Sequence, residues 1–249
     1  TDEYALAKAR SENVLFESGC KNWTIIRPYI TYNTRRLQLG GLELGTWLTA
    51  ALSGRPLVLP KDIGMHQTTM THGGDVARAM TALIGNDKAL GEAFHITCND
   101  HMKWRDVAEI YKDVLEEQTG QHMEIYEPET SDRLAKIMDN VPQIKYDRIY
   151  DRVFDSAKFL SVCGEKFEFV QMKCGVSASL KEYLQLSDSQ RLNKSNPKLY
   201  AWLDKATGRK NLTHGMDSGK NKMIYLGYYY APQIIDNLKK LIGSKRNKH

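Results

Sequence analysis

The segment "THGGDVARAMTALIGNDKALGEAFHIT" (residues 71–97) contains the periodicities that decide the fold class. Its β-type start extends back to Gln67, so residues 67–72 are expected to form a strand that ends at Gly73-Gly74. Asp75 is placed to cap a helix whose inner face is predicted to hold Val76, Met80, Leu83 and Ile84. Residues 93–97 follow as a buried strand. A strand, a helix and another strand in succession indicate an α/β protein.

The same alternation continues on both sides of this segment. Residues 23–27 form a short β-branched run that Pro28 ends, and residues 42–52 carry apolar side chains at helical spacing. Residues 123–126 are expected to form a strand, and Ser131 to cap a short helix. The clearest helix begins at Trp104 and ends before Gly120. Its apolar face is predicted to contain Trp104, Val107, Ala108, Tyr111, Val114 and Leu115.

The C-terminal part of the chain differs from the rest in composition. From about residue 187 polar and basic residues dominate, and a tyrosine-rich segment with Tyr228, Tyr229 and Tyr230 follows. We expect this segment to pack as an added helix. Beyond it, one helical face is predicted to be buried on the domain or on a second subunit, and it consists of Ile234, Ile235, Leu238, Leu241 and Ile242.

Composition limits the class of protein. The chain has 249 residues, of which 41% are hydrophobic, so it can bury a real core. No apolar run approaches the roughly 20 residues of a membrane span, and charged residues interrupt the N-terminus where a signal peptide would be apolar. The four widely spaced cysteines predict reduced thiols of a cytoplasmic protein rather than disulfides or a zinc site. The net charge of +5 is concentrated near the C-terminus, so nucleic-acid binding is not expected.

Tyr4 and Lys8 form a candidate catalytic pair. Residues four apart on a helix lie on one face, so the phenol and the ammonium are expected to stand side by side. An ammonium favours the phenolate form of a neighbouring tyrosine, which suits that tyrosine to general acid/base catalysis. A solvated helix face is the alternative.

Three blocks of sequence together resemble the extended short-chain dehydrogenase/reductases, the NAD-dependent epimerase/dehydratase family that modifies nucleotide sugars. The first is Tyr4-x-x-x-Lys8 followed by Glu12, which looks like the family's catalytic helix. The second is "WTIIRPYITYN" (residues 23–33), similar to its strand ending in Arg-Pro. The third is the segment 71–97. The resemblance covers roughly residues 1–186.

The resemblance implies the C-terminal part of a Rossmann-type parallel sheet with a small mixed α/β substrate-binding domain. Residues 1–100 would belong to the Rossmann domain, with a substrate-loop insertion around 33–70. Residues 101–190 would form the substrate-binding domain, and residues 191–249 a basic, tyrosine-rich helical tail. The family's glycine-rich dinucleotide-binding turn has no counterpart here, since no G-x-x-G-x-x-G occurs. We therefore expect the N-terminal half of the same protein to complete the fold.

The family's functional residues carry over to nine positions. Tyr4 would be the general acid/base, assisted by Lys8, which would also bind the nicotinamide ribose of NAD or NADP. Pro28, Tyr29 and Ile30 match the loop beside the nicotinamide. The substrate candidates are Asn33, Arg35, Arg36 and Arg55. Arg35 and Arg36 are candidates for holding phosphate oxygens, and Arg55 lies in a segment that resembles the family's small substrate-domain strand.

The implied activity is NAD(P)-dependent oxidation, epimerisation or dehydration of a nucleotide-linked sugar, and it allows a homodimer. The sequence does not choose between NAD and NADP or among these reactions. A non-catalytic relative that binds RNA, or an assembly or scaffold protein, is the alternative. Retention of Tyr4 and Lys8 argues against the RNA-binding alternative, and a bound dinucleotide in the purified protein would count against both.

Overall fold

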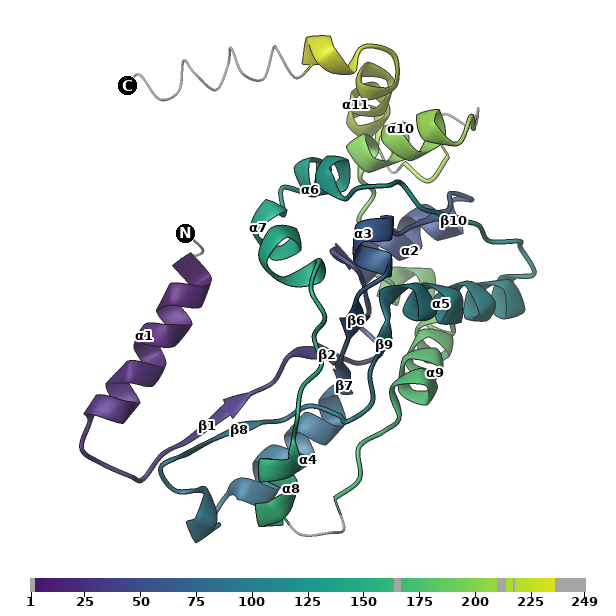
Figure 1. The fold of residues 1–249 in the computed structure, drawn as a ribbon. Coiled ribbons are helices and arrows are strands. Elements are labelled where there is room, and N and C mark those ends of the chain that lie inside the picture. Colours follow the sequence, from purple (N-terminus) through teal and green to yellow (C-terminus); the bar gives the residue numbers. More distant parts are fainter. Residues whose placement is uncertain (1–2, 164–166, 210–213, 217, 236–249) are drawn as a thin grey trace, which may run out of the picture.

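The computed structural model describes residues 3–163, 167–209, 214–216 and 218–235 (Figure 1). The helices are α1 (Glu3–Glu17), α2 (Leu44–Leu52), α3 (Lys61–Gly64), α4 (Gly73–Leu83), α5 (Trp104–Thr119), α6 (Asp132–Met138), α7 (Val141–Gln143), α8 (Ala157–Cys163), α9 (Met172–Leu184), α10 (Pro197–Ala206) and α11 (Gly219–Tyr230). The strands are β1 (Thr24–Arg27), β2 (Ile30–Tyr32), β3 (Gln38–Leu39), β4 (Leu42–Glu43), β5 (Leu57–Val58), β6 (Gln67–Thr68), β7 (Met70–His72), β8 (Glu92–His95), β9 (Met102–Lys103) and β10 (Ile125–Tyr126).

The strands pair two by two, and three of the pairs are parallel. β1 pairs with β8, with Ile26 opposite Phe94, and β2 pairs with β7. β5 pairs with β10. Parallel pairs with helices between their strands confirm the predicted α/β class. A wider Rossmann-type sheet stays a prediction, as does the division near residues 100 and 190.

Two predicted elements are divided in the structure. The strand expected at 67–72 changes partner at Thr69, because β6 pairs with β9 whereas β7 pairs with β2. The helix expected at 42–52 begins only at Leu44. Gly40, with φ +54°, and Gly41 turn a two-residue hairpin between β3 and β4, so the chain is extended before α2 starts.

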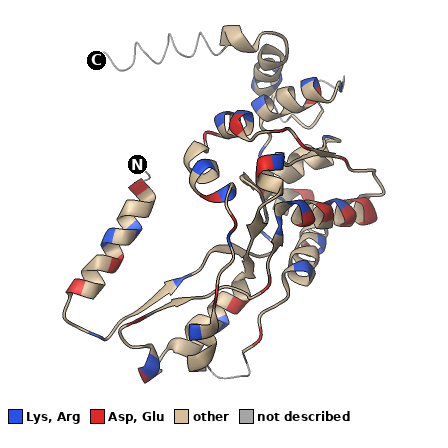
Figure 2. Ribbon diagram, in the orientation of Figure 1, with Lys and Arg blue, Asp and Glu red and all other residues tan. Residues whose placement is uncertain are grey.

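The main hydrophobic core is built around α5. All six residues predicted for its apolar face are buried, and Gly120 ends the helix with φ 68°. Trp47 of α2 stacks on Tyr111 at 4.7 Å between ring centres, and its indole N–H donates to the carbonyl of Leu37. Figure 2 shows acidic residues along the exposed side of α5. The helix is therefore amphipathic as its periodicity predicts.

A second, smaller core lies between α4, β8 and α8, at the end of the molecule that holds β1 (Figure 1). Val76 and Leu83 are buried there as predicted, together with Ala79. The prediction was wrong for Met80 and Ile84, which are 48% and 80% exposed. The buried stripe runs at i, i+3 and i+7, and this spacing leaves positions 80 and 84 facing outwards.

Asp75 does not cap α4, because the helix begins two residues earlier, at Gly73. Asp75 is buried inside the first turn, where its carboxylate accepts a hydrogen bond from the backbone N–H of Val170 at 2.7 Å and pairs with Arg78 at 2.6 Å. Ser131 does precede α6, but its hydroxyl donates to Asp62 rather than capping the helix. Both side chains join distant segments instead.

The C-terminal helices belong to the main core. α10 and α11 lie side by side at the end of the molecule opposite β1 (Figure 1). Tyr225 and Tyr228 of α11 are buried, which confirms that the tyrosine-rich segment packs on the domain. Of the predicted stripe beyond it, Ile235 packs against this core and Ile234 is exposed. Leu238, Leu241 and Ile242 lie outside the described residues.

The structure bears on the expectations for disulfides, membrane-spanning helices and metal-binding clusters. All four cysteines are free thiols. Within the described ranges no helix is long and apolar enough to cross a membrane, and no cluster of His, Cys, Asp or Glu there is suited to hold a metal ion.

Candidate active site

Tyr4 and Lys8 lie on one face of α1, as predicted. The Lys8 ammonium nitrogen is 5.6 Å from the centre of the Tyr4 ring, and Tyr4 is 70% exposed. None of the described residues of α1 is buried. The pair is therefore accessible to a ligand from solvent.

Two contacts connect α1 to the segment that follows it. Glu12 accepts a hydrogen bond from Arg27 Nε at 2.9 Å and a second from Nη2, so the carboxylate and the guanidinium pair at the end of β1. This hydrogen bonding to Arg27 lowers the pKa of Glu12. Phe16 packs edge to face on Trp23, with ring centres 5.3 Å apart. Helix α1, which carries Tyr4, is thus attached to β1 and the residue before it by an ion pair and an aromatic contact.

Tyr29 follows β1, at the carboxyl ends of the parallel strands β1 and β8. Its hydroxyl donates to Asp147 Oδ1 at 2.7 Å and accepts from Arg148 Nη1 at 3.1 Å. Its ring packs on Phe154 at 4.8 Å between centres, and Phe154 also meets His95 at the end of β8. Burial raises the pKa of Tyr29, so this phenol stays protonated at neutral pH. The carboxyl ends of parallel strands are where ligands usually bind in α/β proteins.

Asp147 and Arg148 lie in the π-helical turn Ile144–Arg148 that follows α7. Asp147 pairs with Arg148 and accepts from Arg152 Nε at 2.7 Å. Arg148 is only 2% exposed, and it donates to the carbonyl of Gly40 and to Gln38 Oε1 at 2.9 and 3.0 Å. The carboxylate is thus held by one buried and one half-buried guanidinium.

A cavity of about 820 Å³ brings these groups together with α1. Tyr4 lines it on one side, and Gln143, Tyr146, Asp147 and Arg152 line it on the other. Because Asp147 also holds the Tyr29 hydroxyl, the cavity connects the two predicted regions, α1 and the loop after β1. It is large enough for a small-molecule ligand.

Sequence reasoning missed the segment 142–152 altogether. A signal was present, because Tyr-Asp-Arg occurs twice at a spacing of four residues, at 146–148 and 150–152. Repeated phenol, carboxylate and guanidinium groups at helical spacing indicate a polar cluster on one face. π-helical turns are also common at functional sites.

The other two residues of the predicted nicotinamide loop differ in exposure. Pro28 is exposed directly after β1. Ile30 lies in β2 opposite Met70, and its side chain is buried in the main core. None of Pro28, Tyr29 and Ile30 is in the described lining of a cavity that contains Tyr4, and Tyr29 is linked to that cavity through its hydrogen bond to Asp147.

Asn33, Arg35 and Arg36 form a tight polar turn after β2. The Asn33 side-chain oxygen accepts from the backbone N–H of Arg35 at 2.8 Å, and the backbone of Asn33 pairs with that of Arg36. Arg35 Nη1 donates to the carbonyl of Gln190. All three side chains are exposed, but no contact in the described structure joins them to Tyr4 or Asp147.

Arg55 lies in the interior, away from solvent. It is 2% exposed, and its Nη2 and Nε donate to Asp204 Oδ2 at 2.8 and 3.2 Å. Nη1 donates to Ser53 Oγ at 2.6 Å and to the carbonyl of His214 at 2.9 Å. Its guanidinium carbon is 4.1 Å from the centre of the Tyr200 ring. The protein's own groups therefore surround this side chain.

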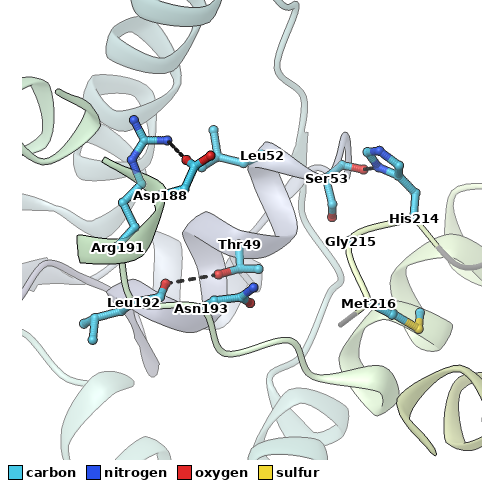
Figure 3. A pocket seen from close by; sticks show the side chains of 10 residues that line it. All are labelled: Thr49, Leu52, Ser53, Asp188, Arg191, Leu192, Asn193, His214, Gly215 and Met216. Atoms are coloured by element: carbon cyan, nitrogen blue, oxygen red, sulfur yellow. Dashed lines mark hydrogen bonds and ion pairs between the residues drawn. The ribbon is translucent and has the colours of Figure 1, made fainter. Parts of the chain in front are cut away.

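A second cavity, of about 470 Å³, lies at the carboxyl end of α2 (Figure 3). Thr49 of α2 and Ser53, directly after the helix, border it, facing Asp188 and Arg191, which pair at 3.3 Å. The ring of His214 contacts the Ser53 carbonyl at its rim. None of the nine predicted site residues lines it. Of the nine predicted residues, the described lining of the first cavity includes Tyr4.

Comparison with known proteins gives a partial match. No family model matches the chain. Over 67 residues, 27% of this chain, it is 34% identical to 2'-dehydrokanamycin reductase of Streptomyces kanamyceticus, of which the match covers 19%.

Among solved structures, Pal from Bacillus thuringiensis matches with a TM-score of 0.52 and 20% identity, over 73% of this chain and 52% of that one. UDP-glucuronic acid 4-epimerase from Bacillus cereus, in complex with UDP-glucuronic acid and NAD, matches with a TM-score of 0.46 and 16% identity, over 65% and 45% of the two chains. RMD from Pseudomonas aeruginosa, complexed with NADPH, matches with a TM-score of 0.49 and 16% identity, over 74% and 56%. The chain spans about half the length of these structures, and it shares the fold of the corresponding part of Pal.

Proposed function

We propose that the protein is an NAD(P)-dependent oxidoreductase, epimerase or dehydratase that acts on a nucleotide-linked sugar. The partial sequence match to a reductase supports this class, and the fold shared with Pal supports an α/β architecture. NAD and NADPH in the weaker structural matches are consistent with it. The chain spans only part of the length of the matched proteins, so the activity, the cofactor and the substrate are all proposals.

The observation that carries the proposal is the position of Tyr4. Its phenol, with the Lys8 ammonium on the same helix face, lines the cavity that also contains Asp147. A tyrosine beside a cation, open to a cavity whose wall also holds a carboxylate, suits proton transfer to or from a bound hydroxyl group. A merely solvated helix face would not need to border a cavity of this size.

In this proposal Tyr4 gives a proton to, or takes one from, a sugar hydroxyl or carbonyl oxygen. Lys8, whose ammonium lies 5.6 Å from the centre of the Tyr4 ring, would also bind the nicotinamide ribose. A nicotinamide cofactor, when bound, supplies the hydride chemistry. Tyr29, held protonated by burial, donates to Asp147 and keeps that carboxylate fixed at the cavity wall.

The residues at the strand ends fit the reacting end of such a cofactor. Pro28 leaves no N–H to satisfy at the end of β1, and the Tyr29 ring offers an apolar surface beside it. The sequence has no G-x-x-G-x-x-G turn, so we assign no group to the dinucleotide phosphates. Asn33, Arg35 and Arg36 remain proposed substrate contacts, whereas we propose that Arg55 has a structural role.

The test replaces the phenol alone. In the protein at its natural length, Tyr4→Phe is expected to lower turnover by at least about 100-fold, the usual contribution of a general acid/base, and to leave dinucleotide affinity nearly unchanged. Lys8→Met is expected to lower both. Turnover is followed by NADH or NADPH absorbance with a panel of nucleotide sugars, and cofactor affinity by calorimetric titration.

Tyr230→Phe is the matched control, since this tyrosine is 68% exposed at the far end of the molecule. It should change neither quantity. Normal turnover by Tyr4→Phe would contradict the proposed catalytic role.

A further inference from the structure

Three helices of the C-terminal half enclose a small cavity that the proposed function does not use. α6 contributes Arg133, Lys136 and Ile137, which lie on one helix face because they are three and four residues apart. α10 contributes Lys198 and Trp202, also four apart. The cavity has a volume of about 120 Å³, several times what one water molecule needs.

The charge of this cavity has one sign. Arg133, Lys136 and Lys198 lie at its wall, and its described lining includes no Asp or Glu. No ion pair between any of these three cations and an acid is found in the described part of the chain. Three like charges facing one hollow repel one another, and a bound anion would remove that repulsion.

The remaining wall is aromatic and apolar. Tyr228 of α11 is buried beneath the cavity, and the Lys198 ammonium lies 5.3 Å from the centre of its ring. Trp202 packs edge to face on Tyr126, with ring centres 5.8 Å apart, which fixes the indole in place. Pro232 closes another side. An anion with a flat or apolar body would contact both kinds of wall.

We propose that this cavity binds an organic phosphate monoester, with the phosphate between Arg133, Lys136 and Lys198 and the organic part against Trp202. A mononucleotide is the simplest ligand with this chemistry. Guanidinium and ammonium groups are the side chains that hold phosphate oxygens with charge-assisted hydrogen bonds. The indole supplies a surface on which a base stacks.

This site is independent of the proposed active site, because it shares no residue with the Tyr4 cavity. Loss of activity in Tyr4→Phe therefore tests one proposal, and loss of ligand in variants of α6 tests the other. Arg133 and Lys136 are exposed, so replacing them should leave the fold intact.

The probes are AMP, inorganic phosphate and adenosine, titrated into the full chain by calorimetry. AMP is expected to bind more tightly than inorganic phosphate, and adenosine not to bind measurably. The affinity for AMP is expected to fall as salt rises. Arg133→Gln or Lys136→Gln should weaken AMP binding about tenfold or more, the effect of losing a hydrogen bond to a charged group. Arg133→Lys should restore part of it.

Lys222→Gln on α11 is the control, since it removes an exposed positive charge elsewhere in the same helical region. It should leave AMP binding unchanged. Equal weakening by Lys222→Gln, binding of adenosine as tight as AMP, or binding of a single-stranded RNA without any binding of AMP would each overturn the proposal. Circular dichroism of every variant establishes that the fold is retained.

Discussion

Replacing Asp204 tests how the C-terminal helices are joined to the rest of the protein. Asp204 and Arg55 are each 2% exposed, and Asp204 also accepts a hydrogen bond from the Tyr225 hydroxyl at 2.9 Å. Asp204→Ala leaves a buried guanidinium without its counter-charge. Breaking a buried pair in this way costs about 3–5 kcal/mol of unfolding free energy. For a chain of 249 residues, this corresponds to a fall in Tm of about 6–20 °C.

The measurement is thermal and urea denaturation followed by circular dichroism. Asp188→Ala is the control, because its carboxylate is 99% exposed and pairs with Arg191 at 3.3 Å. Exposed pairs contribute about 0–1 kcal/mol, so Asp188→Ala should change Tm little. The double variant Arg55→Met, Asp204→Leu should recover most of the lost stability, because it removes both buried charges. A loss below about 1 kcal/mol for Asp204→Ala, or no recovery in the double variant, would refute this account.

Two further predictions concern a helix end and a helix attachment. Gly120→Ala should lower the free energy of unfolding by about 1–2 kcal/mol, measured by urea denaturation, because φ is 68° at this residue. Gly219→Ala is the control and should change this free energy very little, because Gly219 also has open space around an added methyl group but no positive φ. The pKa of Glu12 lies below its ordinary value of 4.5, so attachment of α1 through Arg27 should be complete above that pH and lost as pH falls through the lowered pKa. An NMR titration of the Arg27 Nε–H signal should show this transition and Glu12→Gln should abolish it; a transition that persists in the variant would contradict the assignment.

The spacing of apolar residues predicted where most helices lie, but it predicted less well which of their side chains are buried and how the neighbouring strands pair. The face of α5 was predicted residue by residue, because an amphipathic helix records its burial in the spacing of its own apolar side chains. The same reasoning misplaced Met80 and Ile84, since a short helix next to a small core buries a narrower stripe. The hairpin at Gly40-Gly41 was missed because the helical spacing of apolar residues extends back to Leu42, which lies in the extended strand β4.

The candidate site was predictable only in part, and for a related reason. Tyr4 and Lys8 are four residues apart and were found from spacing. Asp147 lies 118 residues from Tyr29, and its role depends on tertiary packing that no local pattern specifies. Arg55 was expected near a substrate from the family resemblance alone, which does not specify its tertiary partners. Its burial depends on Asp204, which also cannot be identified from the neighbouring sequence.

The pairing of Arg55 with Asp204 also has a consequence for biosynthesis. The two residues are 149 positions apart, and ribosomes add about 5–20 residues per second, so roughly 7–30 s separate their synthesis. During that interval the guanidinium lacks its counter-charge, and the apolar residues of α2 and α5 have neither α10 nor α11 to cover them. Completion of the main core therefore has to wait for the synthesis of α10 and α11. Nascent chains that end before residue 204 are expected to be substrates for chaperones that bind exposed apolar surface.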